Sequence, residues 1–219
     1  MLSSLFSIQR RSRTRRTLLC LGWLVTSLAM SSAAQTAERP TSEGAQAFMN
    51  DLVNRASAAL KSDGTLEQRE HRFRSLLRDG FDMRFIARVA LGKPWKQLSA
   101  GDQNTYTELF SEFVLKTYAP RLGGFDPKRF NVVGAAPKGK RDMLVKTDIS
   151  QEDGGSIAAS WRVRLVGGKH KIVDIIVEGI SMALNQRKEF KSVVQTDGVA
   201  GLTEMLRART GSLSVQPPA

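Results

Sequence analysis

Histidine and cysteine, which supply many catalytic and metal sites, are scarce in this sequence. His71 and His170 are the only histidines, and neither has a cysteine or carboxylate at the spacing of a metal ligand set. A Ser–His–acid triad would need one of them, and no Gly-x-Ser-x-Gly nucleophile elbow occurs. We therefore expect no catalytic site, no metal and no cofactor, and we do not expect an enzyme.

Residues 134–141, Gly-Ala-Ala-Pro-Lys-Gly-Lys-Arg, come close to a phosphate-binding loop. Arg141 stands where such a loop has the Ser or Thr that holds magnesium, and a strand pattern follows where a helix is needed. The stretch therefore predicts a hairpin turn and not a nucleotide site.

Two carboxylates, Asp174 and Glu178, interrupt and end an otherwise apolar strand pattern. As a pair they could perform acid–base catalysis. In the structural alternative Asp174 faces solvent or caps a neighbouring element, and Glu178 pairs with Arg187 or Lys188. The structural interpretation is favoured because no histidine, metal ligand or further acid supports the catalytic one.

Aromatic side chains form the largest remaining group of candidates. Such a group can form a dry core or line an apolar pocket, since both use the same residue types, and the sequence leaves the two open. The group comprises Phe81, Phe85, Trp95, Tyr106, Phe110, Phe113, Tyr118 and Trp161.

The first thirty-four residues have the composition of an export signal. Arginines at residues 10–16 precede an apolar run, residues 17–30, that is shorter than a membrane span, and small residues allow cleavage near Ala34. General secretory and twin-arginine signals both fit. Cys20 lies inside the apolar run, so lipidation is not expected and the mature chain would lack cysteine. We expect a periplasmic protein.

The net charge of the chain is +12, from 33 basic and 21 acidic residues. The export signal holds five of the arginines, so 28 basic and 21 acidic residues remain, a net charge of +7. These charges are mixed along the chain, which does not indicate nucleic-acid binding. Weak attraction to anionic membrane surfaces or acidic partners fits an envelope protein, as does a solvated basic surface without a partner.

Apolar residues recur at helical spacing in the first half of the mature chain. Thr65-x-x-Gln68 and Ser99-x-x-Asp102 are capping-box patterns that mark two helix starts. The predicted helices cover residues 42–61, 65–80, 83–91 and 99–118, and two closing helices cover residues 181–194 and 199–209.

The second half changes to the period of strands. Gly167-Gly168 between two β-branched runs is typical of a two-residue hairpin, and short links imply antiparallel neighbours. The predicted strands cover residues 130–133, 143–149, 157–166 and 169–177.

The predicted fold class is α+β. We expect N-terminal helices and C-terminal helices packed on one face of a four-stranded antiparallel curved sheet, with an apolar pocket between the layers. The domain organisation would be a signal peptide at residues 1–34, a linker at 35–41, a single domain at 42–210 and a flexible tail at 211–219.

Two stretches resemble the MlaC (toluene-tolerance) family. The first is Phe81-Asp-Met-Arg-Phe-Ile-Ala-Arg-Val-Ala-Leu-Gly92, followed by Trp95, Gln103 and a helix ending in Thr117-Tyr118-Ala119. The second is Lys171-Ile-Val-Asp-Ile-Ile-Val-Glu-Gly-Ile-Ser181, followed by Gln186-Arg187-Lys-Glu-Phe190. The order and spacing of the family's motifs are kept over about residues 45–209. A hopanoid-associated branch shares the first pattern, and the second is closer to the phospholipid-transport branch.

The resemblance implies a soluble periplasmic phospholipid carrier with a nuclear-transport-factor-like shape and acyl chains between sheet and helices. It implies an outer-membrane lipoprotein/porin complex and the inner-membrane MCE-domain subunit of an ABC transporter as partners, and a role in outer-membrane lipid asymmetry. A hopanoid-associated lipid-binding protein, a non-lipid periplasmic adaptor with a dry core, and a periplasmic enzyme that uses Asp174 remain as alternatives.

Candidate lipid-binding residues follow from the inward-facing pattern of helices and strands. The strand at residues 169–177 is apolar on both sides, so its inward register is open by one residue. Six further positions match the family and are interpreted as fold-setting: Gly92, Trp95, Asp174, Glu178, Gly179 and Arg187. The lipid-binding candidates are Phe81, Phe85, Val89, Phe110, Val114, Tyr118, Val145, Trp161, Val163, Val173 and Ile175.

Overall fold

The computed structural model describes residues 39–60, 65–119, 126–151 and 154–213. All of them belong to one compact unit, Thr36–Ala219. The predicted signal peptide lies outside the described residues, as do most of the predicted linker and residues 214–219 of the predicted tail. Among the described helices, none combines the length and the apolar content that crossing a membrane requires.

The first two helices begin where their polar residues predict. Helix α1 covers Ser42–Leu60 and α2 covers Leu66–Gly80. The Thr65 hydroxyl accepts a hydrogen bond from the Gln68 backbone N–H (3.2 Å), and the Gln68 side chain accepts one from the Thr65 N–H (3.1 Å). This reciprocal pair confirms the predicted capping box, which satisfies donors that the first helical turn leaves unpaired.

Helix α3 (Met83–Leu91) ends at a glycine that the surrounding structure requires. Gly92 has a φ of 78°, and a Cβ atom there would lie 3.0 Å from Nε of Arg187. That Nε donates a hydrogen bond to the Val89 carbonyl (2.7 Å), so Arg187 satisfies one of the last carbonyls of α3. A short 3₁₀ helix, η1 (Lys93–Gln97), then leads to α4 (Ala100–Tyr118).

The two predicted closing helices form one kinked element, α5 (Met182–Leu213). Gly198 has a φ of 69° and a ψ of −171°, values that do not occur within an α-helix, and the two helical parts meet there. The second part continues to Leu213 and so includes the first three residues of the predicted tail.

The sheet is an antiparallel meander with strand order β1-β2-β3-β4-β5. A 3₁₀ turn, η3 (Pro127–Arg129), precedes β1. The strands cover Phe130–Lys138 (β1), Asp142–Ser150 (β2), Ser156–Val166 (β3), Lys169–Val177 (β4) and Ile180–Ser181 (β5). The prediction had four strands. The fifth arises because the turn at Glu178 and Gly179, with φ of 49° and 78°, returns the chain onto the end of β4. A two-residue strand has no alternation that a sequence pattern could show.

A β-bulge resolves the open register of β4. Arg162 is paired with Asp174, but its neighbour Val163 is paired with Ile172, so Val173 is the extra residue on β4. As a result Ile172 and Ile175 contact the same apolar cluster although they are three residues apart. Alternation along a regular strand would put them on opposite faces.

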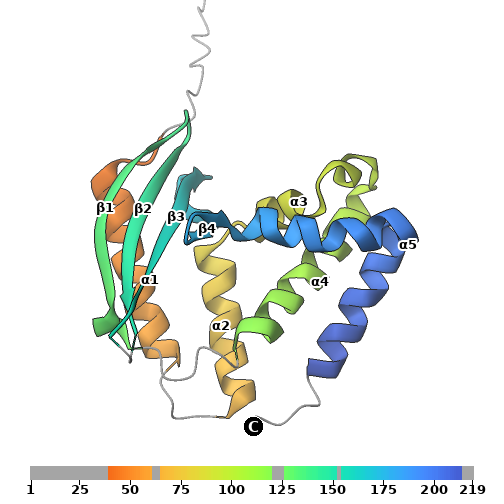
Figure 1. Cartoon of the computed structure of the whole chain (residues 1–219), viewed down its shortest axis with the longest axis horizontal. Coiled ribbons are helices and arrows are strands. Elements are labelled where there is room, and N and C mark those ends of the chain that lie inside the picture. Colours follow the sequence, from red (N-terminus) through yellow and green to blue (C-terminus); the bar gives the residue numbers. More distant parts are fainter. Residues whose placement is uncertain (1–38, 61–64, 120–125, 152–153, 214–219) are drawn as a thin grey trace, which may run out of the picture. The chain divides into compact units, whose positions relative to one another are not determined.

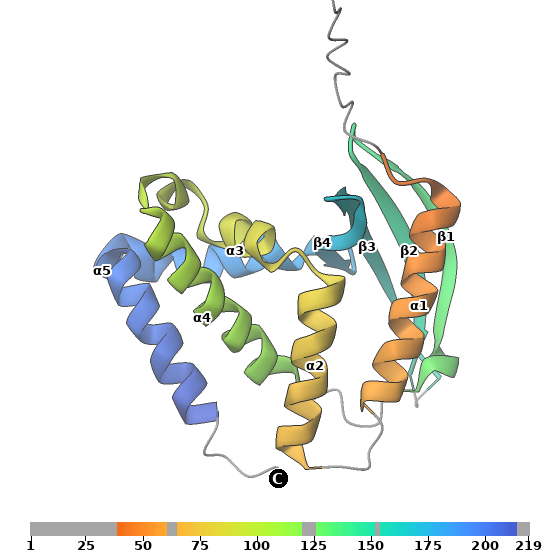
Figure 2. The same cartoon turned by 180° about the vertical axis from the view of Figure 1, so that it is seen from behind.

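The apolar residues form two separate cores. The sheet core lies between the strands and helices α1 and α2, and Figure 2 shows α1 along one face of the sheet. The helix core lies among α3, η1, α4 and α5, which gather beside the sheet in Figure 1. A third, smaller cluster contains Leu77 of α2 with Leu115 and Ala119 at the end of α4. We call this cluster the α2–α4 seam, because it joins the two larger cores.

A buried carboxylate ties the sheet to α3. Asp142 is 2% exposed and accepts hydrogen bonds from Arg164 (2.6 and 3.0 Å) and from Arg162. The Arg164 guanidinium also lies over the ring of Phe85 in α3, 4.5 Å from its centroid. Burial acts to raise the pKa of Asp142, but the hydrogen bonds from Arg164 and Arg162 outweigh it and hold the pKa below its ordinary value of 3.8.

This network predicts a pH-dependent stability. Because the folded-state pKa of Asp142 is depressed, its stabilisation is present above pH 3.8 and lost as the pH falls through the folded-state value. Asp142→Asn should lower the free energy of unfolding by about 2 kcal/mol at pH 7, because two guanidinium groups lose a charged acceptor. Urea unfolding at pH 7 and pH 3 measures the difference between the two proteins, which should narrow at pH 3. The exposed Asp148 of β2 provides the control, Asp148→Asn, and an equal difference at both pH values would contradict the assignment.

Candidate functional site

The candidate lipid-binding residues are distributed over several parts of the described structure. Four of them (Val145, Trp161, Val163 and Ile175) belong to the sheet core, and Phe110 belongs to the helix core, with Val114 against it. The Trp161 indole N–H donates to the Thr147 hydroxyl (2.9 Å), which fixes this ring inside the sheet core. The buried aromatic residues of α4 pack largely on other helices, since the helix core also contains residues of α3 and α5.

The other candidates occupy four different settings. Val173 is the fully buried bulge residue of β4, and Tyr118 is 41% exposed at the end of α4. Phe85 and Val89 are partly buried on α3. Phe81 lines the cavity described next.

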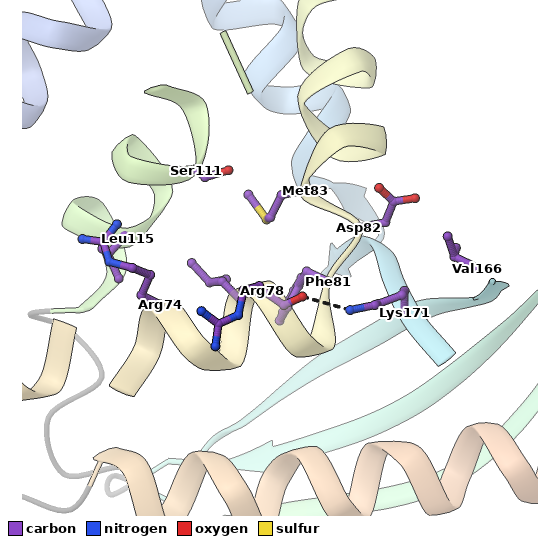
Figure 3. A pocket seen from close by; sticks show the side chains of 10 residues that line it. Arg74, Arg78, Phe81, Asp82, Met83, Ser111, Leu115, Val166 and Lys171 are labelled. Atoms are coloured by element: carbon purple, nitrogen blue, oxygen red, sulfur yellow. Dashed lines mark hydrogen bonds between the residues drawn. The ribbon is translucent and has the colours of Figure 1, made fainter. Parts of the chain in front are cut away.

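This cavity has a volume of about 340 Å³ and lies where α2, the start of α3, α4 and the β3–β4 hairpin meet (Figure 3). It is placed at the boundary between the two cores, since α2 and the hairpin contribute to the sheet side and α4 to the helix side. Its lining residues are Arg74, Leu77, Arg78, Phe81, Asp82, Met83, Ser111, Leu115, Val166 and Lys171.

The interior of the cavity is apolar. Leu77 and Leu115 are 5% and 1% exposed and belong to the α2–α4 seam, with Phe81 and Met83 packed against them. Val166 adds an aliphatic side chain from the end of β3 and is 37% exposed. An apolar wall of this kind gains free energy from any hydrocarbon that it removes from water.

Three basic side chains stand along the same cavity. Lys171 Nζ donates to the carbonyls of Arg78 (2.9 Å) and Asp79 (2.7 Å), in the last turn of α2, where carbonyls lack helical partners. Arg74 forms two hydrogen bonds with Glu112 of α4. The Arg78 side chain is 73% exposed, and its Nε lies 3.4 Å from Oδ1 of Asp79. The cavity thus combines apolar walls with basic side chains near its opening to solvent.

Backbone pairing to β4 holds the α2–α3 connector against the cavity. Phe81 and Ile172 form a parallel bridge, and the Asp82 N–H donates to the Ile172 carbonyl (2.9 Å). The Asp82 carboxylate accepts from the Phe85 N–H (2.9 Å) and so caps α3. The position of Phe81 is therefore set by β4 on one side and by the start of α3 on the other.

Two ion pairs cross the boundary beside the cavity. Lys116 Nζ of α4 lies 2.6 Å from Oε2 of Glu70 in α2, and these side chains are only 14% and 12% exposed. Arg74 of α2 and Glu112 of α4 form the second pair, and each lies one helical turn from the residue of the first pair on its own helix. The two pairs and the α2–α4 seam help to hold α2 to α4.

The two carboxylates that could have formed an acid–base pair have separate structural partners. Asp174 is 9% exposed and accepts from the Ser181 hydroxyl (2.7 Å) and the Ala183 N–H (3.3 Å), so it caps α5. Glu178 accepts from the Ala158 N–H (2.9 Å). The expected pairing of Glu178 with Arg187 or Lys188 is wrong, because the β4–β5 turn directs Glu178 toward β3.

The histidines are also apart from each other. His71 is an exposed residue of α2, whereas the His170 ring stacks on Phe48 of α1 at 5.7 Å between centroids. Within the residues that the structure describes, no three His, Cys, Asp or Glu side chains are grouped as a metal site would require.

Sequence reasoning missed nine of the ten lining residues, yet α2 contained a signal for three of them. Arg74, Leu77 and Arg78 have the spacing i, i+3 and i+4, which puts them on one helix face. This face mixes two arginines with one apolar residue. A face of this composition suits a half-open amphiphile site better than either a core or a solvated surface.

Comparisons with known proteins show which relatives and which fold the chain is similar to. The chain is 20% identical over 161 residues to a Haemophilus influenzae protein named intermembrane phospholipid transport system binding protein MlaC. The aligned residues make up 68% of this chain and 75% of that protein. A solved structure from Ralstonia solanacearum, described as a phospholipid-binding protein in complex with a phospholipid, has the same fold. Its TM-score is 0.65 at 23% identity, over 78% of this chain and 98% of that one.

The family comparison covers most of the domain. A sequence model of the family described as MlaC protein matches residues 46–208. These residues include α2, α4 and the β3–β4 hairpin, and so the whole lining of the cavity. The resemblance and the α+β fold predicted from the sequence are thereby confirmed, and the chain belongs to the MlaC family.

Proposed function

We propose that this chain is a soluble periplasmic phospholipid carrier. It shuttles lipid between an outer-membrane lipoprotein/porin complex and the inner-membrane MCE-domain subunit of an ABC transporter, and so maintains outer-membrane lipid asymmetry. The observation that supports this proposal most directly is the cavity, which has apolar walls and basic side chains at its edge in a member of the MlaC family.

The two parts of the site match the two parts of a phospholipid. Acyl carbons would contact Leu77, Phe81, Met83 and Leu115, and each buried methylene would contribute about 0.8 kcal/mol. The phosphate would lie toward the exposed Arg78, whose guanidinium would exchange its contacts with Asp79 and Ser75 for hydrogen bonds to phosphate oxygens. The apolar contacts supply most of the affinity, and the basic groups orient the molecule.

The cavity must enlarge to hold a whole lipid. At ~30 Å³ per methylene, close to the volume of a water molecule in the liquid, 340 Å³ holds about eleven such groups. Two acyl chains contain considerably more. Because the cavity lies between the two cores, it would enlarge if α3 and α4 moved as a layer away from α2 and the sheet.

This movement would also release the lipid. Leaving the cavity exposes every buried methylene to water, so spontaneous loss is slow. We propose that docking on a partner separates the layers by opening the α2–α4 seam, the two ion pairs beside it and the contact of Phe85 with Arg164. The opened cavity then loses much of its apolar contact with the acyl chains.

Extraction of native lipid tests the proposal. Protein purified from the periplasm without detergent should contain glycerophospholipid in near-stoichiometric amount, measured by mass spectrometry of organic extracts. Hopanoid in place of phospholipid would assign the chain to the hopanoid-associated role. Protein without any lipid, even after incubation with phospholipid vesicles, would overturn the carrier proposal in favour of an adaptor.

A further inference from the structure

The two β-hairpin turns lie together at one end of the sheet. Asp142, the first residue of β2, is paired with Arg164 near the end of β3, so the β1–β2 turn and the β3–β4 turn are neighbours. The backbone of the β1–β2 turn also contacts the segment before α1, since Arg39 Nε donates to the Lys140 carbonyl (3.1 Å). In Figure 1 this is the upper end of the sheet.

This end of the sheet is strongly basic. Five exposed cationic residues gather there: Arg39, Lys138, Lys140, Arg141 and Lys169. We call them the basic end. Asp142 does not offset them, because it is buried and paired with Arg162 and Arg164. Glu43, in the first turn of α1, is an exposed acid near this group.

The basic end adjoins the cavity. Val166 and Lys171, which flank the β3–β4 turn, line the cavity from the hairpin side. Figure 3 shows both side chains on the same side of the site, away from α4. A surface that contacts the basic end would therefore lie next to the cavity.

We propose that the basic end docks on the surface of an anionic phospholipid bilayer. Cationic side chains near such a surface gain electrostatic free energy additively and without fixed geometry, which suits the flexible lysines of two exposed turns. This inference goes beyond the proposed function, and it gives the carrier a way to bring its cavity to the membrane where lipid is exchanged.

The composition of the basic end favours a bilayer over a protein partner. Specific protein interfaces are centred on buried aromatic or arginine anchors, and lysine is depleted in them. The basic end has three lysines, two exposed arginines and no aromatic side chain, so it contains no buried anchor, and the exposed Val166 lies beside it. A fluid layer of negatively charged headgroups needs no such anchor.

Vesicle sedimentation tests the proposal with charge-matched variants. The test variant combines Lys138→Gln, Lys140→Gln and Arg141→Gln. The control variant removes the same charge from exposed lysines of η1 and α5, by Lys96→Gln, Lys188→Gln and Lys191→Gln. Each protein is mixed with vesicles of equimolar phosphatidylglycerol and phosphatidylcholine, or of phosphatidylcholine alone, at low and high salt.

Wild-type protein should bind the anionic vesicles at low salt, and binding should weaken at high salt because screening shortens the range of the attraction. The test variant should bind on the order of 100-fold more weakly, and the control variant within a few-fold of wild type. Equal binding by both variants, or equal binding of wild type to neutral vesicles, would overturn the proposal. So would wild-type protein that does not bind anionic vesicles, a result that would favour an acidic protein partner.

Lipid extraction separates this proposal from the carrier function. None of the three substituted residues of the basic end lines the cavity, so the test variant should retain the phospholipid content of wild type. Protein that sediments through the basic end yet carries no lipid would contradict the carrier function alone. Protein that carries lipid but ignores anionic vesicles would contradict only the docking surface.

Discussion

Lys116→Met is expected to lower the free energy of unfolding by about 3–5 kcal/mol. Lys116 and Glu70 are 14% and 12% exposed, so the substitution leaves a carboxylate largely removed from water without its partner. The lost attraction is only part of this cost, since most of it comes from the unpaired buried charge. Chemical denaturation monitored by circular dichroism gives the magnitude.

The double variant Glu70→Met, Lys116→Met tests the cause. With both charges removed, methionine side chains of similar length can pack in the boundary, and most of the lost stability should return. Arg207→Met, which breaks the exposed Arg207–Glu204 pair of α5, should change stability by less than about 1 kcal/mol. A double variant as unstable as Lys116→Met alone would show that packing, and not the unpaired charge, determines the loss.

The proposed opening motion would break the Glu70–Lys116 pair, because this pair lies at the boundary between the two cores. Glu70–Lys116 and Arg74–Glu112 are the ion pairs between α2 and α4, beside a seam that contains few apolar residues. The two larger cores on either side are extensive and separately packed. The seam contains fewer buried apolar residues than either core, which is why the proposed opening is placed at this boundary.

Local signals in the sequence predicted the elements well. Thr65 and Ser99 occupy their helix N-cap positions, Gly92 ends α3, and the glycine pair 167–168 forms the β3–β4 turn. Each of these features depends on residues within one turn of the chain, and such features appear directly in the sequence.

The cavity could not be predicted in the same way, because long-range packing decides which face of each element is covered. The sequence left open whether the aromatic residues of α4 form a core or line a pocket. In the structure α5 packs on that side, and Phe110 and Phe113 belong to the helix core. Phe190 of α5 contacts both rings, at 6.2 and 6.0 Å between centroids. Nothing local to α4 indicates that α5 lies there.

The bulge in β4 limited prediction in a different way. Ile172, Val173 and Asp174 are all buried, so neither alternation nor composition fixes the register. The extra residue arises from pairing with β3 and from the capping role of Asp174 toward α5. The carboxylate of Asp174 within a buried strand was the one sign in the sequence that another element, here α5, contacts β4 at this residue.

Ser111→Trp should abolish most phospholipid binding. Ser111 lines the cavity from α4 and is only partly buried, so a bulky side chain can extend into the cavity without displacing a residue of either core. If the indole fills half of the cavity, about five methylene groups of the acyl chains can no longer be buried. The binding free energy then becomes less favourable by about 4 kcal/mol. This is roughly a thousandfold decrease in affinity.

Thr105→Trp is the matched control, because Thr105 is an exposed residue of the same helix and lies outside the cavity lining. Phospholipid in extracts of both purified variants is measured by mass spectrometry, and circular dichroism confirms that both are folded. The control should carry as much lipid as wild type and Ser111→Trp almost none. A folded Ser111→Trp protein with full lipid content would mean that acyl chains enter elsewhere, and the sheet core with Val145, Trp161 and Val163 would then be the alternative binding region.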